Sequence, residues 1–208
     1  MNTGFVFLSG SALGVICYFI AELLTPKQVA NPGDHDIFLA NRLGFIYTPV
    51  VGLWLGWLQR SWQRALVGAA VGIVIGVIYM SLCASRNFLA IMVGFPCLLG
   101  AMLSAVVGSN RSHWLRGLGA RVGKGLLAGL VLGFVYMVIL NVVGEMLRPD
   151  IETTPTHNEL TDNYVQMMWR SGPIALGISS ALFFVLIRWA VGLTRVRVLV
   201  FEETESAR

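Results

Sequence analysis

The sequence predicts an all-α fold, a polytopic membrane bundle of six transmembrane helices. Three observations lead to this prediction: a shortage of charged residues, six long apolar stretches, and basic residues that cluster in alternate connections. Of the 208 residues, 56% are hydrophobic and 12% are charged, and the mean hydropathy is +0.72. Soluble domains contain about 25% charged residues. The chain therefore has too few charges to cover a water-facing surface.

Each apolar stretch is long enough to cross a bilayer, since a spanning helix needs about 20 mostly apolar residues. The first stretch has no basic segment before it and no small-residue cleavage site, so we expect it to be retained rather than removed as a signal peptide. We expect one transmembrane domain over residues 1–194 and a short cytoplasmic tail over residues 195–208. The six stretches cover approximately residues 4–24, 38–58, 65–83, 88–108, 122–147 and 173–193.

The longest connection, at about residues 148–172, contains one more predicted helix. The residues THNE, from Thr156 to Glu159, fit a capping box, in which a hydroxyl caps the helix and a carboxylate follows three residues later. Apolar residues then recur at helical spacing as far as Met168. The pattern predicts a short amphipathic helix near 157–169, lying at the outer membrane interface or packed over the mouth of the bundle.

Basic residues predict the orientation of the chain. They gather after the second span, after the fourth span and in the tail. They are Arg60 and Arg64, then Arg111, Arg116, Arg121 and Lys124, then Arg195, Arg197 and Arg208. All three segments fall on one side, which the positive-inside rule assigns to the cytoplasm. We therefore expect an integral, multi-pass membrane protein with both termini cytoplasmic, and we attribute the net charge of +4 to the cytoplasmic loops.

Two spans carry the same glycine pattern. Residues 64–80, RALVGAAVGIVIGVIYM, and residues 121–137, RVGKGLLAGLVLGFVYM, are identical at seven of seventeen positions. Glycines four residues apart form a slanted groove on a helix, where a neighbouring backbone approaches closely and gains dispersion energy. Each groove is expected to receive another helix, and the two groove helices are candidates for packing on each other. The groove glycines are Gly68, Gly72 and Gly76, and Gly125, Gly129 and Gly133.

Weaker forms of this pattern occur in the other spans. The first span contains Gly10 and Gly14, and the even-numbered spans contain PVVG, PCLLG and PIALG, which begin at Pro49, Pro96 and Pro173. The chain is therefore interpreted as three repeated helical hairpins. In each hairpin a glycine-grooved helix goes out and a proline-containing helix returns. Internal repeats and broken helices of this kind are typical of transporters.

Four ionisable residues lie at or near the predicted outer ends of spans, where a charge is expensive and marks a candidate functional site. Glu22 and Glu145 end the first and fifth spans, both in the pattern Glu-x-Leu-x-Pro. Arg42 lies about one turn inside the second span, and Arg170 precedes the sixth. Two interpretations stay open. The pairs Glu22–Arg42 and Glu145–Arg170 fix the hairpins as ion pairs, or the four residues surround an outward-facing polar vestibule that takes up a proton or a cation.

Four further polar residues carry weaker expectations. His35 and His157 follow the two glutamates at similar separations, so Glu plus His from matched segments is a weak candidate for a metal site. No other cofactor is indicated. Asn141, inside the fifth span, is expected to hydrogen-bond to another helix. Arg188, late in the sixth span, is expected to extend its charged end to the membrane interface.

These features leave three classes of function open. The preferred class is a small transporter or channel-like protein with an outward-facing polar vestibule. The second is a non-catalytic subunit or assembly factor of a larger membrane complex, which the lack of a charge near mid-membrane favours. The third is a membrane-embedded metal-dependent enzyme, which the absence of HExxH and related motifs disfavours. The expected partners are the lipid bilayer and either further copies of the chain or another membrane protein, and no nucleic acid is expected.

Overall fold

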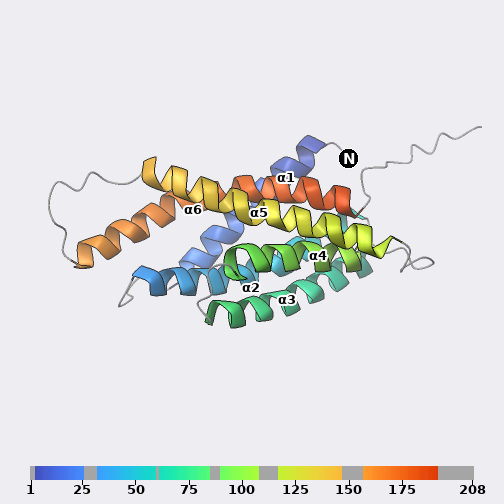
Figure 1. The fold of residues 1–208 in the computed structure, drawn as a ribbon, viewed down its shortest axis with the longest axis horizontal. Coiled ribbons are helices and arrows are strands. Elements are labelled where there is room, and N and C mark those ends of the chain that lie inside the picture. Colours follow the sequence, from blue (N-terminus) through green and yellow to red (C-terminus); the bar gives the residue numbers. More distant parts are fainter. Residues whose placement is uncertain are drawn as a thin grey trace, which may run out of the picture.

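The computed structural model describes residues 3–25, 32–59, 61–84, 90–107, 117–146 and 157–191. In this part of the chain every regular element is helical, and the helices lie side by side in a bundle (Figure 1). The elements are α1 (Thr3–Leu23), α2 (Pro32–Leu58), α3 (Trp62–Ala84), the π-helical turn η1 (Ala90–Gly94), α4 (Phe95–Val107), α5 (Leu118–Met146) and α6 (His157–Ala190).

The six predicted spans are confirmed. Six helical segments in the described part of the chain are long and apolar enough to cross a membrane, and η1 together with α4 supplies the fourth. Their bounds agree with the predicted ones to within a few residues, because runs of apolar residues mark spanning helices clearly. The second is Phe38–Leu58, for example, and the fifth is Leu118–Met146. The fold is therefore that expected of a multi-pass membrane protein.

The predicted outer helix near 157–169 is not a separate element. Residues 157–169 form the first part of α6, which continues through Pro173 to Ala190. A proline inside a helix removes one backbone hydrogen bond and kinks the helix, but neighbouring groups in a membrane bundle compensate for the loss. The side chains of residues 32–37 and 157–169, and the tail at 195–208, lie outside the part that the structure describes.

The two ends of the bundle differ in charge. Arg64 and Lys124 lie near the starts of α3 and α5, and Arg188 lies near the end of α6; we call this the basic end. Glu22 and Glu145 lie at the ends of α1 and α5, at the opposite end, which we call the acidic end. The helices α1, α3 and α5 run from the basic end to the acidic end, and α2, α4 and α6 run back (Figure 1).

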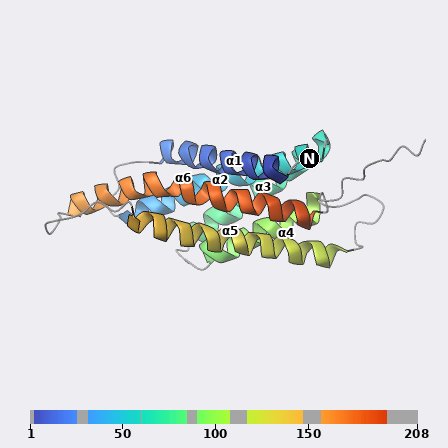
Figure 2. The ribbon, with the colours of Figure 1, turned by 90° about the horizontal axis from the view of Figure 1, so that it is seen from above.

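The central helix is α6. In its spanning segment 67% of the residues are buried, against 22% in that of α5. It packs extensively on α1 and α5 and also touches α2 and α4, and Figure 2 shows it between α1 and α5. Its buried positions include small residues, Ala175, Ser179, Ser180 and Ala181. Small side chains let neighbouring helices approach closely.

The glycine groove of α3 receives α2. A Cβ atom added to Gly72 would stand 2.7 Å from the Cα atom of Pro49, and one added to Gly68 would overlap the backbone of Gly52. One turn further along, a Cβ atom on Gly76 would stand 3.3 Å from the Cα atom of Phe45. Backbone therefore meets backbone along this pair.

The groove of α5 receives α4 in the same manner. A Cβ atom added to Gly129 would stand 2.7 Å from the Cα atom of Cys97, and one added to Gly125 would overlap the carbonyl group of Gly100. Gly133 faces the carbonyl group of Met92 in η1. The helices α3 and α5 do not contact each other within the described residues, so the alternative that they pack on each other is wrong.

The first and last helices form a third pair of this kind. A Cβ atom added to Gly14 of α1 would stand 2.7 Å from the carbonyl oxygen of Leu176 in α6, and one added to Gly10 would stand 2.9 Å from the side chain of Phe184. The closest glycine contacts thus join α3 to α2, α5 to α4 and α1 to α6. They cross between the predicted hairpins rather than lying within them.

Candidate functional site

A cavity of about 270 Å³ lies inside the acidic half of the bundle. Its residues come from the first half of α2, the end of α3, the start of α4, the second half of α5 and the middle of α6, and η1 contributes one wall. Nearly all of them are apolar or aromatic. The lining consists of Leu39, Ala40, Leu43, Gly44, Tyr47, Tyr79, Ile91, Met92, Phe95, Pro96, Leu132, Gly133, Tyr136, Met137, Leu140, Asn141 and Leu176.

The polar groups of the cavity are mainly tyrosine hydroxyls. The hydroxyl of Tyr47 is hydrogen-bonded to the hydroxyl of Ser180 in α6, with the two oxygens 2.8 Å apart. Tyr79 stacks on Phe95, with ring centroids 3.8 Å apart, and so joins α3 to α4. Tyr136, half-buried on α5, lies on the same lining. An apolar chamber with a few hydrogen-bonding groups is the usual form of a small-molecule site.

The π-helical turn η1 shapes one wall of this chamber. A π turn contains one more residue than an α-helical turn, so it widens the helix locally, and such turns are frequent at functional sites. Ile91 and Met92 of η1 line the cavity, and Gly133 of α5 lies against the Met92 carbonyl group. The missing side chain at Gly133 lets α5 approach η1 closely, because a Cβ atom there would overlap the Met92 carbonyl group.

Dense packing closes the cavity on the side of the basic end. Trp54 of α2 meets Phe184 of α6 edge to face, with ring centroids 4.4 Å apart. Leu99 and Leu103 of α4 and Leu55 of α2 are fully buried in the same core cluster. Most of the large, fully buried side chains therefore lie in the basic half, whereas the cavity lies in the acidic half.

Thr48 joins α2 to α3 near the boundary between these two halves. Its hydroxyl lies 2.8 Å from the Gly44 carbonyl oxygen of its own helix and 2.6 Å from the Gly72 carbonyl oxygen of α3. A hydroxyl has one proton to donate, so the two carbonyl groups share it. The groove glycine Gly72 therefore both admits α2 and accepts a hydrogen bond from it.

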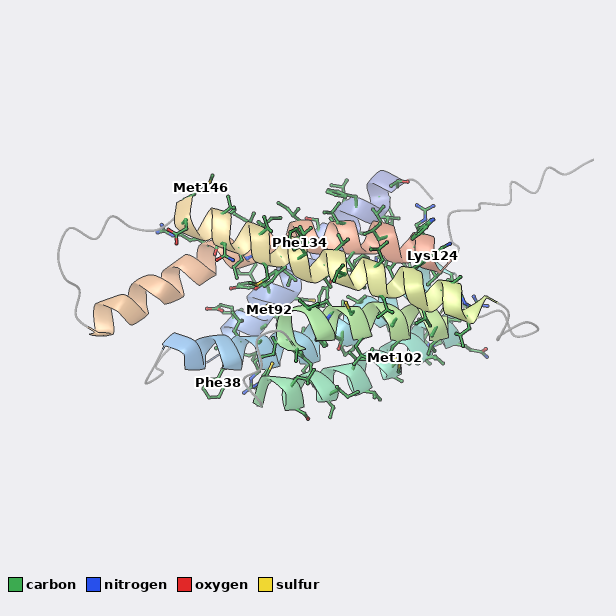
Figure 3. All side chains as sticks on the ribbon, in the orientation of Figure 1. Phe38, Met92, Met102, Lys124, Phe134 and Met146 are labelled. Atoms are coloured by element: carbon green, nitrogen blue, oxygen red, sulfur yellow. The ribbon has the colours of Figure 1, made fainter. Side chains whose placement is uncertain are left out.

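A second hollow lies next to the cavity, where α5 meets η1. It is a groove between α5 and η1, bounded mainly by apolar residues, among them Val93, Leu130, Val138 and Val142. Phe134, which is 69% exposed, lines it, and Met92 and Phe134 lie on the same side of the bundle (Figure 3). Four residues line both the groove and the cavity: Met92, Gly133, Met137 and Asn141.

Within the part of the chain that the structure describes, Asn141 bonds to its own helix rather than, as the sequence predicted, to another one. Its amide nitrogen donates to the Met137 carbonyl oxygen of its own helix at 2.7 Å. The side chain is exposed at the point where the groove meets the cavity. A lone amide in an apolar span was visible in the sequence. Its position at a junction of two hollows depends on the packing of η1 against α5, which the sequence pattern did not indicate.

No protein-family model, curated protein or solved structure matches the chain. The interpretation of the cavity therefore depends on its own geometry.

None of the four predicted vestibule residues lines this cavity. Glu22 is only 2% exposed, near the end of α1, whereas Arg42, Glu145 and Arg170 are exposed. The hollow does lie at the acidic end, where a vestibule was expected, but its walls are apolar and aromatic. The ion pairs Glu22–Arg42 and Glu145–Arg170 remain predictions.

The predicted metal ligands His35 and His157 lie where the structure does not describe side chains. Among the residues that it does describe, no group of three or more His, Cys, Asp or Glu side chains is placed to hold a metal ion.

Arg188 does not extend to the membrane interface as predicted, since it is only 7% exposed. It lies in the last turn of α6, where the bundle is densely packed. The neighbouring Trp189 is the exposed residue, and the Lys124 ammonium group of α5 lies 4.4 Å from the centroid of its ring. This cation–π contact joins α5 to α6 at the basic end.

Proposed function

We propose that this protein is a small membrane transporter and that the cavity is its substrate chamber. The asymmetry of the interior supports this proposal. The acidic half holds a chamber, and the basic half is closed by packed side chains such as Trp54 and Phe184. A transporter that opens alternately to the two sides of a membrane has this form when one side is closed.

We also propose that the basic end faces the cytoplasm, so that both termini are cytoplasmic and the chamber faces outward. The positive-inside rule supports this orientation, because Arg64, Lys124 and Arg188 all lie at the basic end.

The glycine pairs suggest how such a protein moves. We propose that α2–α3, α4–α5 and α6–α1 are three copies of one unit, each held together by a glycine zipper. In every unit, glycines four residues apart on one helix meet the other helix at matching four-residue steps, as at Gly68 and Gly72 and at Gly125 and Gly129. Units that are tightly joined within themselves are suited to rocking as rigid bodies about a fixed site.

A second candidate is a non-catalytic subunit of a membrane complex, formed with other chains or with further copies of this one. One observation favours it: the described residues that line the cavity include no Asp, Glu, Lys, Arg or His. A path for an ion usually has such a group. A transporter with this chamber would therefore carry an uncharged substrate. A subunit of a complex would not need to carry any substrate.

Cysteine accessibility distinguishes the two candidates. In a chain whose three cysteines, Cys17, Cys83 and Cys97, are replaced, Leu43→Cys reports on the chamber and Leu103→Cys reports on the packed half. A transporter exposes Leu43→Cys to a membrane-impermeant maleimide from the acidic end, and Leu103→Cys from the basic end in its alternate state. Val74→Cys is the matched control, because Val74 is 54% exposed on the outside of α3 and faces lipid.

Labelling of Leu103→Cys from the basic end, with Val74→Cys unlabelled, supports transport. Labelling of Leu43→Cys alone, under every condition tested, would show a static chamber and favour the complex subunit. A disulfide that locks the acidic end should raise the labelling of Leu103→Cys if the two halves open alternately.

A further inference from the structure

We propose that the substrate is an amphiphile dissolved in the membrane, with a long apolar tail and an uncharged hydrogen-bonding head, and that it reaches the chamber sideways from the lipid between η1 and α5. This inference builds on the proposed transporter function. It concerns the same cavity and adds the class of substrate and the route by which it arrives.

The route is inferred from the wall that the two hollows share. The groove between α5 and η1 and the internal cavity share Met92, Gly133, Met137 and Asn141. At Gly133 the boundary is a close contact of α5 with the Met92 carbonyl group, so a passage would lie along the side chains of Met92 and Met137. The two methionines are unbranched and flexible, and methionine adapts to irregular gaps. The boundary between lipid and chamber is thus made of a backbone surface and movable side chains rather than of rigid aromatic rings.

The groove fits an apolar tail. Along α5 it extends from Leu130 to Val142, a length of about 18 Å at 1.5 Å per residue. This is close to half of the roughly 30 Å hydrocarbon thickness of a bilayer. Its residues are apolar apart from Asn141, and Phe134 and Val138 are exposed along it. A single alkyl or isoprenoid chain lying along α5 would occupy one leaflet.

The head would lie near Asn141, Tyr136 and Tyr79. Asn141 uses one amide hydrogen on the Met137 carbonyl group, and an amide has a second hydrogen and an acceptor oxygen to offer. Tyr79 and Tyr136 place phenol groups on the same cavity. Among the described residues that line the two hollows there is no carboxylate, amine, guanidinium or imidazole, so a charged head would meet no counter-charge from them, and burying an unpaired charge is costly. An alcohol, a ketone or a quinone ring meets these conditions.

The volume of the cavity agrees with a ligand whose head lies in the cavity and whose tail lies in the groove. A cavity of about 270 Å³ is just below the range of about 300–1,000 Å³ that holds drug-sized molecules. It accommodates a head and a few attached carbons and does not accommodate a whole long-chain lipid. The remainder of the tail would therefore stay in the groove during binding.

Photolabelling tests the proposal. The probe is a long-chain alcohol with a diazirine near its hydroxyl group, added to the purified full-length protein in phosphatidylcholine vesicles. The labelled residues are mapped by mass spectrometry. We expect labels on cavity residues such as Tyr79, Phe95 and Leu132, and at least a fivefold loss of these labels with an excess of the unlabelled alcohol. The same excess of an alkane without a hydroxyl group should displace much less.

Met137→Trp tests the sideways route, because an indole at this boundary narrows the passage. The matched control is Val138→Trp, which lines the groove but not the cavity. Met137→Trp should abolish labelling of the cavity and spare labelling of the groove, and Val138→Trp should retain both. Met92→Trp is a second test of the same boundary, to be used if Met137→Trp loses its monodisperse elution in detergent. Asn141→Leu should remove the preference for the alcohol over the alkane.

Three outcomes separate the parts of the inference. No competed label in the cavity would overturn the amphiphile. A competed label that survives both Met137→Trp and Met92→Trp would overturn the sideways route. In either case, alternating labelling of Leu43→Cys and Leu103→Cys would leave the transporter proposal standing. If the cavity is photolabelled but Leu43→Cys and Leu103→Cys do not label alternately, the protein is an amphiphile-binding subunit rather than a transporter.

Discussion

Glu22 is a buried carboxylate near the end of a membrane span. Its side chain is only 2% exposed, although it lies close to the end of α1. A carboxylate in such a place needs a compensating partner, because desolvation of a charge is expensive. Arg42 is exposed on α2, a helix that contacts α1. At the scale of single residues, the main question is whether this guanidinium supplies the compensation.

A double-mutant cycle on Glu22 and Arg42 answers it. Removing one partner of a buried ion pair costs about 3–5 kcal/mol, because the other charge is stranded. Arg42 is exposed, so water screens part of the interaction and the loss should fall below that range. We expect Arg42→Gln to lower the melting temperature in detergent and Glu22→Gln/Arg42→Gln to recover part of the loss. Strictly additive single effects would mean that the two residues do not pair.

Residue roles were predicted unevenly from the sequence. The groove glycines and the lone amide Asn141 attract attention because their residue types are unusual in apolar spans. The burial of Arg188 and the bond of Asn141 to its own helix depend on which face of each helix is covered, and residue type does not determine that. Tyr79 and Tyr136 were visible as the matched ends of the repeated segments, but their place on a cavity required the positions of α2, η1 and α6.

At the scale of helices, a glycine contributes to stability only where the backbone of another helix lies against it. Gly129 and Gly123 are both on α5. A Cβ atom on Gly129 would overlap the Pro96 carbonyl group, whereas one on Gly123 would meet nothing within 4 Å. A glycine-to-alanine change can therefore be compared at two positions of the same helix. Gly129 has a neighbouring backbone, and Gly123 has none within 4 Å.

We expect Gly129→Ala to destabilise the protein and Gly123→Ala to leave it unchanged or more stable. Overpacking typically costs about 1–3 kcal/mol, and replacing an uncrowded helical glycine by alanine gains about 0.5–1 kcal/mol. Gly72→Ala should behave like Gly129→Ala, because it meets the Thr48 carbonyl group. The measurement is thermal unfolding in detergent. Equal tolerance of the three changes would contradict the close α2–α3 and α4–α5 contacts.

The helices themselves were predictable because twenty-residue apolar runs leave few alternatives. Their ends were less so. The first turns of α5 include Arg121 and Lys124, so hydropathy placed the span at about 122 where the helix begins at Leu118. The short helix predicted near 157–169 is continuous with the sixth span, because α6 runs without a break from His157 through Pro173 to Ala190.

At the scale of the whole molecule, the charge difference between the two ends determines the expected orientation. Cysteines introduced near residues 62, 116 and 205 should react with an impermeant reagent only from the cytoplasmic side, and cysteines near 32 and 156 only from outside. The positive-inside rule gives this assignment. Outside labelling near 116 would reverse the orientation and would place the chamber on the cytoplasmic side.

The pairing of helices was the least predictable property. The sequence suggested consecutive hairpins, whereas the closest backbone contacts join α2 to α3, α4 to α5 and α1 to α6. Grooves of glycines indicate that a helix will be received but do not specify which one. That choice depends on the shapes of all six helices together, including the small buried residues of α6.

The α1–α6 pair affects how the protein is made. The ribosome releases α1 before α6, with more than a hundred residues between them. At about 5–20 residues per second, the glycines of α1 wait on the order of ten seconds or more for the helix that covers them. During that interval Gly10 and Gly14 present bare backbone to lipid or to whatever insertion factor holds the nascent chain. The arrival of α6 therefore covers the glycines of α1, and a chain truncated before α6 would leave Gly10 and Gly14 without the helix that packs on them.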